Sequence, residues 1–256
     1  MRRYVFAGNW KMHKTVSEAV ALARALREGL EKEPTRHEVV VMPPFTALPA
    51  VGEALKGSPI AMGAQNMHWE REGAFTGEIS PVMLRDLGCS YAILGHSERR
   101  HIFEETDEWI GKKSRAAFDH GLTPMVCVGE TLAERESSRT LEVVQRQVER
   151  ALRPLQAEEV ARMVVSYEPV WAIGTGRVAT PEQAEEVQAF LRQRIARSHG
   201  DDAAEAVRIL YGGSVNPGNI SGIMVQADVD GVLVGGASLK PDSFLQIVNY
   251  RESGAV

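Results

Sequence analysis

The chain has 256 residues, enough for one large domain or two small ones, and its hydrophobic content of 44% suffices for a substantial core. A net charge of −5 and a sequence pI near 5.9 exclude the basic surface that binds nucleic acid or an anionic membrane. No apolar run approaches the roughly 18 residues of a membrane-spanning helix, and Asn9 and Lys11 interrupt the N-terminal apolar run too early for a signal peptide.

The two cysteines, Cys89 and Cys127, each lie in an apolar run. This placement is typical of buried, reduced thiols in a reducing compartment. We therefore expect a soluble, cytoplasmic protein.

Apolar runs of strand length alternate with longer segments of helical periodicity along the whole chain. The predicted strands are Tyr4–Ala7, Glu38–Met42, Ile60–Ala64, Tyr91–Leu94, Thr123–Val128, Met163–Tyr167, Val207–Tyr211 and Gly231–Val234.

Clear signals mark several of the helices between these strands. Thr15 and Glu18 form a capping-box pattern, and Thr180 with Gln183 forms another, with Pro181 at the first helical position. Apolar residues then recur at helical spacing, as Val20, Leu22, Leu26 and Leu30, as Leu141, Val144, Val148, Leu152 and Leu155, and as Val187, Leu191 and Ile195.

Eight alternations without a linker, repeat or low-complexity segment favour an α/β fold in which helices cover a parallel sheet. Eight units favour a closed (β/α)₈ barrel, a single domain over residues 1–256, rather than an open doubly wound sheet. Such a barrel places its functional groups on the loops that follow the carboxyl ends of the strands.

Polar or glycine residues cluster just after five of the eight predicted strands. Scattered surface polarity would not keep this register, so we expect the clusters to share one rim of the barrel. They comprise Asn9 and Lys11, His96 to Glu98, Glu168, Gly212 to Ser214, and Gly235 with Gly236.

Glu168 ends a buried strand and precedes Pro169, which disfavours helix at the glutamate. The apolar segment Val170–Ile173 and then Gly174-Thr175-Gly176 follow it. A stiff apolar loop between a proline and two glycines is typical of a lid, and a carboxylate beneath a lid is a candidate general base. The alternative is an ordinary strand-to-helix connection with an apolar patch.

Lys11 and His96 are the candidate electrophilic groups. A lysine at the barrel mouth would offset an anionic substrate or a developing oxyanion, although most lysines are simply solvated. His96 starts a short helix, whose positive end favours a neutral imidazole able to donate a hydrogen bond to a carbonyl oxygen. The alternative for His96 is a capping histidine. The His-x-Glu spacing to Glu98 also occurs in zinc deaminases, but no Pro-Cys-x-x-Cys segment follows and the two cysteines are remote from each other. His101 is five residues away, not the four of a helical zinc pair, so no metal is expected.

The two glycine pairs follow the seventh and eighth predicted strands. Glycines let a ligand approach main-chain N–H groups closely, and in a barrel these two loops are the usual phosphate position. The segment Gly174–Ala179 formally matches a dinucleotide pattern, but it does not directly follow a strand and no acidic strand end follows it. We therefore expect no cofactor.

The segment Gln65–Glu78 is long for a loop between a strand and a helix. Met67, Trp69 and Phe75 are costly to leave in water together, which predicts that this loop docks against a partner. A poorly ordered insertion is the alternative.

Taken together, these segments resemble the triosephosphate isomerase family from residue 4 to about residue 250. Three positions depart from the family's usual residues: His13, Met67 and Arg177. The segments that carry the resemblance are Ala7–Met12, Ala64–Asn66, Thr76–Glu78, Leu94–Arg100, Tyr167–Gly176, Tyr211–Val215 and Val234–Ala237.

The resemblance implies a TIM barrel enzyme that interconverts dihydroxyacetone phosphate and D-glyceraldehyde 3-phosphate through an enediolate, in glycolysis and gluconeogenesis. By matching position, Glu168 would be the base, neutral His96 would polarise the carbonyl oxygens, and Asn9 and Lys11 would stabilise the oxyanion. Gly174, Ser214, Gly235 and Gly236 would hold the phosphate, with Glu98 and Gly213 in supporting positions. The resemblance also implies a homodimer in which the Gln65–Glu78 loop, with Thr76 at its tip, reaches the partner's site.

Two other hypotheses use the same residues. An aldolase would form a Schiff base on Lys11, which requires a desolvated lysine. A barrel that only binds phosphorylated ligands would need no catalytic groups, and the combination of Glu168, His96 and Lys11 argues against it.

Overall fold

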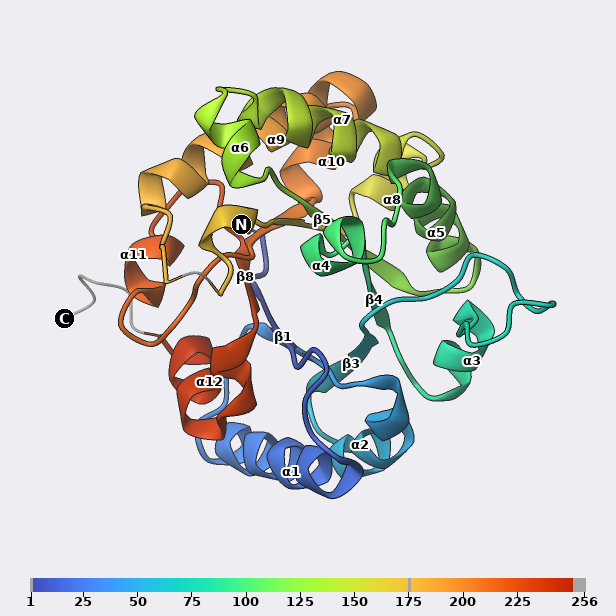
Figure 1. Ribbon diagram of the computed structural model, residues 1–256. Helices are drawn as coiled ribbons and strands as arrows, with labels where there is room; N and C mark the ends of the chain where they lie inside the picture. Colours follow the sequence, from blue (N-terminus) through green and yellow to red (C-terminus); the bar gives the residue numbers. More distant parts are fainter. Residues whose placement is uncertain (1, 175, 251–256) are drawn as a thin grey trace.

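The computed structural model describes residues 2–174 and 176–250. Its strands form one closed parallel barrel in sequence order, β1 to β8, with β8 paired to β1 (Figure 1). The predicted (β/α)₈ barrel is confirmed. The strands are β1 (Val5–Asn9), β2 (Glu38–Met42), β3 (Ile60–Ala64), β4 (Tyr91–Leu94), β5 (Thr123–Val128), β6 (Val164–Tyr167), β7 (Arg208–Tyr211) and β8 (Gly231–Val234).

Three strands differ from the prediction in where they begin or end. β1 begins one residue later and continues to Asn9, because Asn9 still pairs with Met42 of β2. Met163 and Val207 lie outside β6 and β7. A hydrophobic pattern ends at the first polar residue, whereas a strand continues for as long as its neighbour offers hydrogen bonds.

Helices surround the barrel as an outer ring (Figure 1). They are α1 (Val16–Lys32), α2 (Leu48–Leu55), α3 (Pro81–Asp86), α4 (Ser97–His101), α5 (Asp107–Asp119), α6 (Leu132–Glu136), α7 (Thr140–Leu152), α8 (Ala157–Val160), α9 (Pro181–His199), α10 (Asp201–Ala206), α11 (Ile220–Met224) and α12 (Pro241–Val248). Three short 3₁₀ helices also occur in this part of the chain, η1 (Phe45–Ala47), η2 (Val170–Ala172) and η3 (Gly236–Leu239).

The predicted helix starts are confirmed. The N–H of Thr15 donates to the Glu18 carboxylate at 2.7 Å before α1. Thr180 and Gln183 bond reciprocally before α9, at 3.0 and 3.2 Å. The predicted stripe of α7 differs at both ends: Leu141 is 37% exposed at the start of the helix, and Leu155 is buried but lies beyond the end of the helix at Leu152.

The alternation of side chains along the strands creates two apolar layers. One layer lies between the strands and the helices and includes Phe6 and Val165. The other fills the barrel interior and includes Val5, Ala7 and Val164. Burial on both faces explains why the strands read as continuous apolar runs.

Both cysteines are free and buried, and burial raises the pKa of the Cys89 thiol to about 12. Within residues 2–174 and 176–250, no helix has the length and apolar character needed to cross a membrane.

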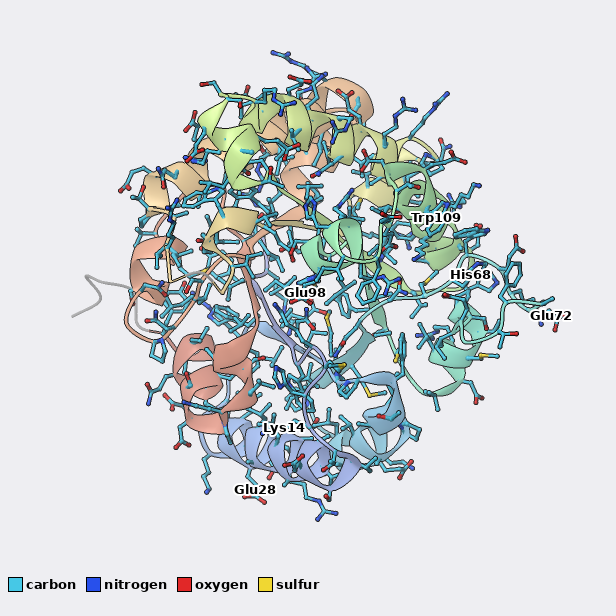
Figure 2. All side chains as sticks on the ribbon, viewed as in Figure 1. Lys14, Glu28, His68, Glu72, Glu98 and Trp109 are labelled. Carbon is cyan, nitrogen blue, oxygen red and sulfur yellow. The ribbon has the colours of Figure 1, made fainter. Side chains whose placement is uncertain are left out.

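The segment Gln65–Glu78 forms an arm whose residues 70–78 are all exposed, and Glu72 marks its outer end in Figure 2. The expectation for its apolar side chains was wrong for Met67, which is completely buried within its own chain. Trp69 is also accommodated, because its ring lies 4.1 Å from His68 and 5.8 Å from Trp109. Phe75 remains 44% exposed.

Candidate active site

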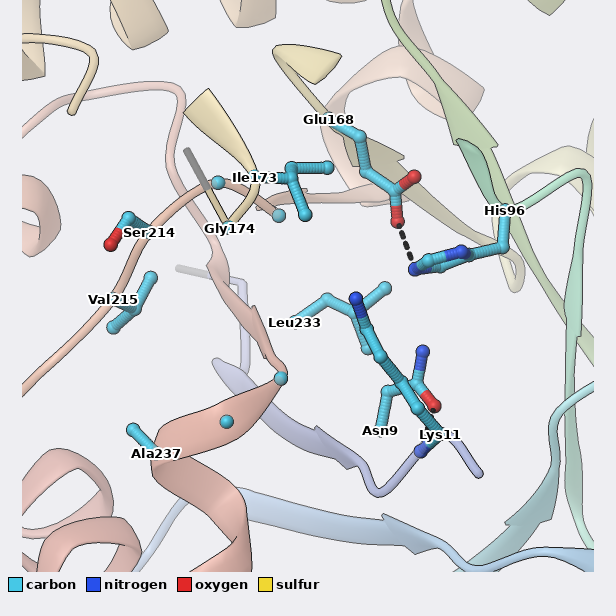
Figure 3. Close-up of a pocket in the computed structure, with 14 residues that line it drawn as sticks. Asn9, Lys11, His96, Glu168, Ile173, Gly174, Ser214, Val215, Leu233 and Ala237 are labelled. Carbon is cyan, nitrogen blue, oxygen red and sulfur yellow. Dashed lines mark hydrogen bonds and ion pairs between the residues drawn. The ribbon is translucent and has the colours of Figure 1, made fainter. Parts of the chain in front are cut away.

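A cavity of about 260 Å³ opens at the carboxyl ends of the strands (Figure 3). It collects the predicted residues from the loops after β1, β4, β6, β7 and β8. Its lining residues are Asn9, Lys11, His96, Glu168, Ile173, Gly174, Gly212, Gly213, Ser214, Val215, Leu233, Gly235, Gly236 and Ala237. Glu98 does not line the cavity.

Strand periodicity directs two of these side chains to the barrel axis. Val164 of β6 lies in the interior layer while Val165 and Tyr167 face the helices. Continuing this period of two brings Glu168 to the inner face, where its side chain is 2% exposed. The same alternation through Val5 and Ala7 of β1 directs Asn9 inward.

The Glu168 carboxylate contacts both Ser97 and His96 at the start of α4. Its Oε2 accepts the main-chain N–H of Ser97 at 2.9 Å, and its Oε1 lies 3.4 Å from Nε2 of His96. Its own N–H donates to Val128 of β5 at 2.7 Å. A Cβ on Gly129 would lie 1.7 Å from the Glu168 carbonyl oxygen, so only glycine leaves room for this main chain.

His96 caps the N-terminus of α4, and its Nδ1 accepts the N–H of Glu98 at 3.2 Å. Accepting this bond requires a lone pair on Nδ1, so the hydrogen-bond network assigns the ring proton of the neutral imidazole to Nε2. Nε2 is the nitrogen that faces Glu168 and the cavity. The imidazole is thereby oriented as a hydrogen-bond donor.

Lys11 adopts a left-handed backbone conformation with φ of 50°. A non-glycine residue in this region is strained by about 1–3 kcal/mol unless its surroundings hold it. Here two amides hold it, because its N–H donates to Asn9 Oδ1 at 3.0 Å and its carbonyl accepts Nε2 of Gln65 at 2.9 Å. The loop therefore presents Lys11 in one conformation.

The ammonium of Lys11 forms an ion pair of 2.7 Å with Oε1 of Glu98. Burial raises the pKa of Glu98, but the hydrogen bond and charge of Lys11 outweigh it and hold that pKa below its ordinary value. Lys11 is thus a positive charge at the cavity wall (Figure 3).

The opposite side of the cavity consists mostly of main chain. Ser214 follows β7, and Gly235 and Gly236 follow β8 and begin η3. Gly213 has no room for a side chain, because its Cβ would lie 2.2 Å from the Tyr211 hydroxyl. Bare N–H groups at the start of a short helix favour an anion.

The predicted lid begins as η2 (Val170–Ala172) and is anchored by the buried Glu130. The Glu130 carboxylate accepts the indole N–H of Trp171 at 2.8 Å and the Tyr167 hydroxyl at 3.1 Å. Arg135 pairs with Glu130 at 3.0 Å and lies 4.7 Å from the centre of the Trp171 ring.

At the far end of the lid, Gly174 and Gly176 have φ of 69° and 79°, values that suit glycine. Gly174 also lines the cavity. Thr175, between them, lies outside the described residues.

Several residues of the site escaped the sequence prediction. Ser97 contributes its main-chain N–H, which no side-chain pattern reveals. Glu130 and Gln65 bond to loops that are far from them in the sequence, so sequence spacing gives no signal for them. Leu233 could have been found, since the strand period that places Val232 outside directs Leu233 into the interior.

The site combines a buried carboxylate, an imidazole donor, an ion-paired lysine and a main-chain anion cradle. Within residues 2–174 and 176–250, no group of His, Cys, Asp and Glu side chains is arranged to hold a metal ion. The fold and this arrangement are typical of (β/α)₈ barrel enzymes that use acid–base chemistry on anionic substrates.

Comparison with known proteins then defines the family. Residues 4–251 match the family model described as triosephosphate isomerase. Among relatives with that name, the protein of Caldanaerobacter subterraneus subsp. tengcongensis is 55% identical over 250 residues, 98% of this chain and 100% of the relative. The Moorella thermoacetica protein is 56% identical over 252 residues, with the same coverage, and that of Roseiflexus sp. is 55% identical over 250 residues, 98% of each chain. The chain belongs to the triosephosphate isomerase family.

Proposed function

We propose that Glu168, His96, Lys11 and Asn9 carry out the proton transfers of triose-phosphate isomerisation in the cavity of Figure 3. The single observation that carries this proposal is the 3.4 Å approach of His96 Nε2 to Glu168 Oε1. A base and a hydrogen-bond donor so close together can act on adjacent atoms of one small substrate.

The family is that of the aldose–ketose isomerases that interconvert dihydroxyacetone phosphate and D-glyceraldehyde 3-phosphate, a reaction of glycolysis and gluconeogenesis. Triosephosphate isomerases are themselves the standard example of a glutamate base working beside a neutral histidine. The reaction moves one proton between two neighbouring carbons and a second proton from the hydroxyl oxygen to the former carbonyl oxygen, and it passes through an enediolate.

Glu168 is the base in this proposal. It removes the proton from the carbon next to the carbonyl and returns it to the neighbouring carbon. When substrate binds, the carboxylate releases the Ser97 N–H, which donates to it at 2.9 Å, and approaches the substrate carbon. A carboxylate that accepts such a hydrogen bond is a weaker base than a free one, so this release makes Glu168 more basic. This exchange couples substrate binding to activation of the base.

His96 and Lys11 stabilise the charge that develops on the substrate oxygens. The Nε2–H of His96 donates to the carbonyl oxygen as it becomes an alkoxide, while the Lys11 ammonium supplies a full positive charge. Asn9 lies beside them and also holds the Lys11 loop through its Oδ1. Lys11 is paired with the Glu98 carboxylate at 2.7 Å, whereas the Schiff-base chemistry of an aldolase requires a desolvated lysine, so the pairing disfavours that chemistry.

The phosphate is bound by main-chain N–H groups of Gly174, Ser214, Gly235 and Gly236. This assignment is supported by the space around Gly174 and Gly236: among the residues that the structure describes, no atom lies within 4 Å of a Cβ placed on either glycine, so the main chain is accessible. Gly213 supports the loop. Closure of the lid over the phosphate would exclude water and strengthen every electrostatic contact inside.

The active form is a homodimer in which the Gln65–Glu78 arm contacts a second copy. Thr76 and Gly77 are the central residues of a turn closed by the Glu78 N–H on the Phe75 carbonyl at 3.0 Å. Apolar side chains on the same rim remain exposed and would be covered in the dimer: Met12 at 95%, Ile102 at 68%, Phe103 at 63% and Phe75 at 44%. The free cysteines support a cytoplasmic location.

A coupled assay that follows the isomerisation of dihydroxyacetone phosphate tests this proposal. Turnover by the folded protein is the expected result, with loss of turnover in the Glu168→Gln variant. A folded sample that binds the substrate without turning it over would support a barrel that only binds. Borohydride trapping of a covalent adduct on Lys11 would support an aldolase.

A further inference from the structure

Arg100 of α4 is a partly buried residue whose guanidinium bonds to three groups outside its helix, in the turn before α4, in β5 and in α5. Its Nε donates to the Gly95 carbonyl at 2.8 Å, its Nη2 to the Cys127 carbonyl at 3.0 Å, and its Nη1 to Oδ1 of Asp107 at 2.5 Å. The side chain is 8% exposed. It does not line the cavity, so it makes no contact with a bound substrate there.

The first of these bonds acts on the peptide that joins Gly95 to His96. A peptide unit is planar, so holding the Gly95 carbonyl also sets the plane of the His96 nitrogen. Gly95 turns the chain with φ of 69°, and a Cβ there would lie 3.0 Å from Nη2 of Arg100 and 2.5 Å from Ile110. The guanidinium therefore packs directly against the turn that carries the histidine.

The second bond connects this turn to β5, the strand that holds the base. Cys127 pairs with Ser166 of β6, and the next carbonyl, that of Val128, accepts the N–H of Glu168 at 2.7 Å. Two neighbouring carbonyls of β5 therefore hold the two groups: that of Cys127 holds the Gly95–His96 turn through Arg100, and that of Val128 holds the main chain of Glu168. The separation between His96 Nε2 and Glu168 Oε1 depends on this frame.

The third bond holds the guanidinium itself. Asp107, in the first turn of α5, accepts Arg100 through Oδ1 and Arg146 through Oδ2 at 3.2 Å. A planar fork can serve two carbonyls and a carboxylate in fixed directions, whereas a lysine ammonium is a point charge on a flexible stem.

We propose that Arg100 is a positioning residue for the isomerisation, acting through His96. The inference rests on the proposed role of His96 as the electrophile. Without the guanidinium, the Gly95–His96 turn is no longer held to β5, and the imidazole loses its fixed approach to the substrate carbonyl. A displacement of about 1 Å in a reacting group costs on the order of 10²-fold in rate.

The test compares Arg100→Lys with a matched control, Arg192→Lys. Arg192 is a buried arginine, and its guanidinium also donates to the carbonyls of Ala204, Val207 and Asp228 and to the carboxylates of Asp228 and Asp230. It lies at the amino ends of β7 and β8, away from the cavity. Both substitutions remove a guanidinium and its hydrogen bonds, but only Arg100→Lys removes a bond to the Gly95–His96 turn.

Three quantities are measured on the folded full-length proteins: kcat, KM and the ¹⁵N chemical shifts of the His96 ring. We expect Arg100→Lys to lower kcat about 10- to 100-fold, to change KM far less, and to shift or broaden the His96 signals. Arg192→Lys should lower Tm while leaving kcat and the His96 signals as in the parent. Unchanged kcat and unchanged ring signals in folded Arg100→Lys would overturn the proposal.

A double variant separates this inference from the proposed function. If Arg100 acts through His96, Arg100→Lys should have no further effect on kcat in a His96→Gln background. Additive losses would show that Arg100 acts elsewhere and would overturn the inference.

If His96→Gln alone leaves kcat unchanged, the role of His96 fails, while the ring signals still report whether Arg100 positions it. If Arg100→Lys does not fold, Asp107→Asn loosens the same guanidinium and is assayed in its place, with the same outcomes.

Discussion

Nε2 of His96 lies 3.4 Å from Oε1 of Glu168, and the ring proton of His96 is on Nε2 because Nδ1 accepts the Glu98 N–H. A hydrogen-bond donor and a carboxylate thus face the same small volume. Each is held by main-chain groups of the same short helix, since Ser97 donates to Glu168. The start of α4 therefore arranges both groups.

Glu168→Gln should lower kcat by about 10² to 10⁴-fold with a much smaller change in KM. The amide keeps the shape of the side chain but cannot accept a proton from carbon. Steady-state kinetics in both directions measure the effect. A loss in kcat of less than about tenfold would mean that Glu168 is not the base.

Gly236→Ala should weaken phosphate binding without destabilising the fold. Within the described part of the chain, a Cβ at this position meets no atom within 4 Å, but it enters the cavity where the phosphate is expected. KM for the triose phosphate and Ki for inorganic phosphate should both rise, while Tm stays level or rises, as for a compatible Gly→Ala change. Gly222→Ala, in α11 with its Cβ 3.8 Å from Pro181, is the matched control. Equal Ki values in both variants would refute the assigned phosphate position.

Lys11→Met should raise the pKa of Glu98, because the lysine that lowers it is lost while the burial that raises it remains. In the parent, the lowered pKa makes Glu98 stabilising above its unfolded pKa of about 4.3. That contribution is lost as the pH falls through the folded pKa. A ¹³C NMR titration of the Glu98 carboxyl measures both values, and an unchanged pKa in the variant would exclude this pairing in solution.

Trp171→Phe should alter the kinetics of the lid by removing the 2.8 Å indole bond to Glu130. A single hydrogen bond to a charged group contributes about 1.5–3 kcal/mol, so the equilibrium between lid conformations should shift by about tenfold or more. Relaxation-dispersion NMR of Gly174 and Gly176 reports this exchange. Trp109→Phe, a tryptophan 42% exposed on α5, serves as the control, and identical dispersion in the two variants would contradict an anchor at Glu130.

Phe75→Glu should weaken the proposed dimer, because it places a charge on an exposed apolar side chain of the arm. We expect light scattering to show a dimer for the parent and dissociation on dilution for the variant, with activity falling in parallel. Met83→Glu, on α3 and 53% exposed, controls for the added charge. A parent protein that is monomeric and fully active at assay concentration would refute the dimer.

Much of the barrel could be predicted because its information is local. Strands buried on both faces appear as apolar runs, and the capping pairs at Thr15 and Thr180 mark where helices begin. Parallel strands bring their carboxyl ends to one rim, so the clusters after them had to be neighbours. This is why the register of Asn9, His96 and Glu168 was readable.

The remainder depends on contacts between residues far apart in the chain. The apolar arm residues pointed to a partner, yet Met67 is buried in its own chain, because burial depends on which neighbours the fold supplies. The sequence by itself determined the barrel, the rim and the chemical groups available there. Only the tertiary structure decided which nitrogen of His96 faces Glu168, how Lys11 is held in a strained conformation, and that Arg100 joins the histidine turn to β5. Hydrogen bonds have direction and reach only about 3 Å, so a pattern of residue types cannot specify them until the chain has folded.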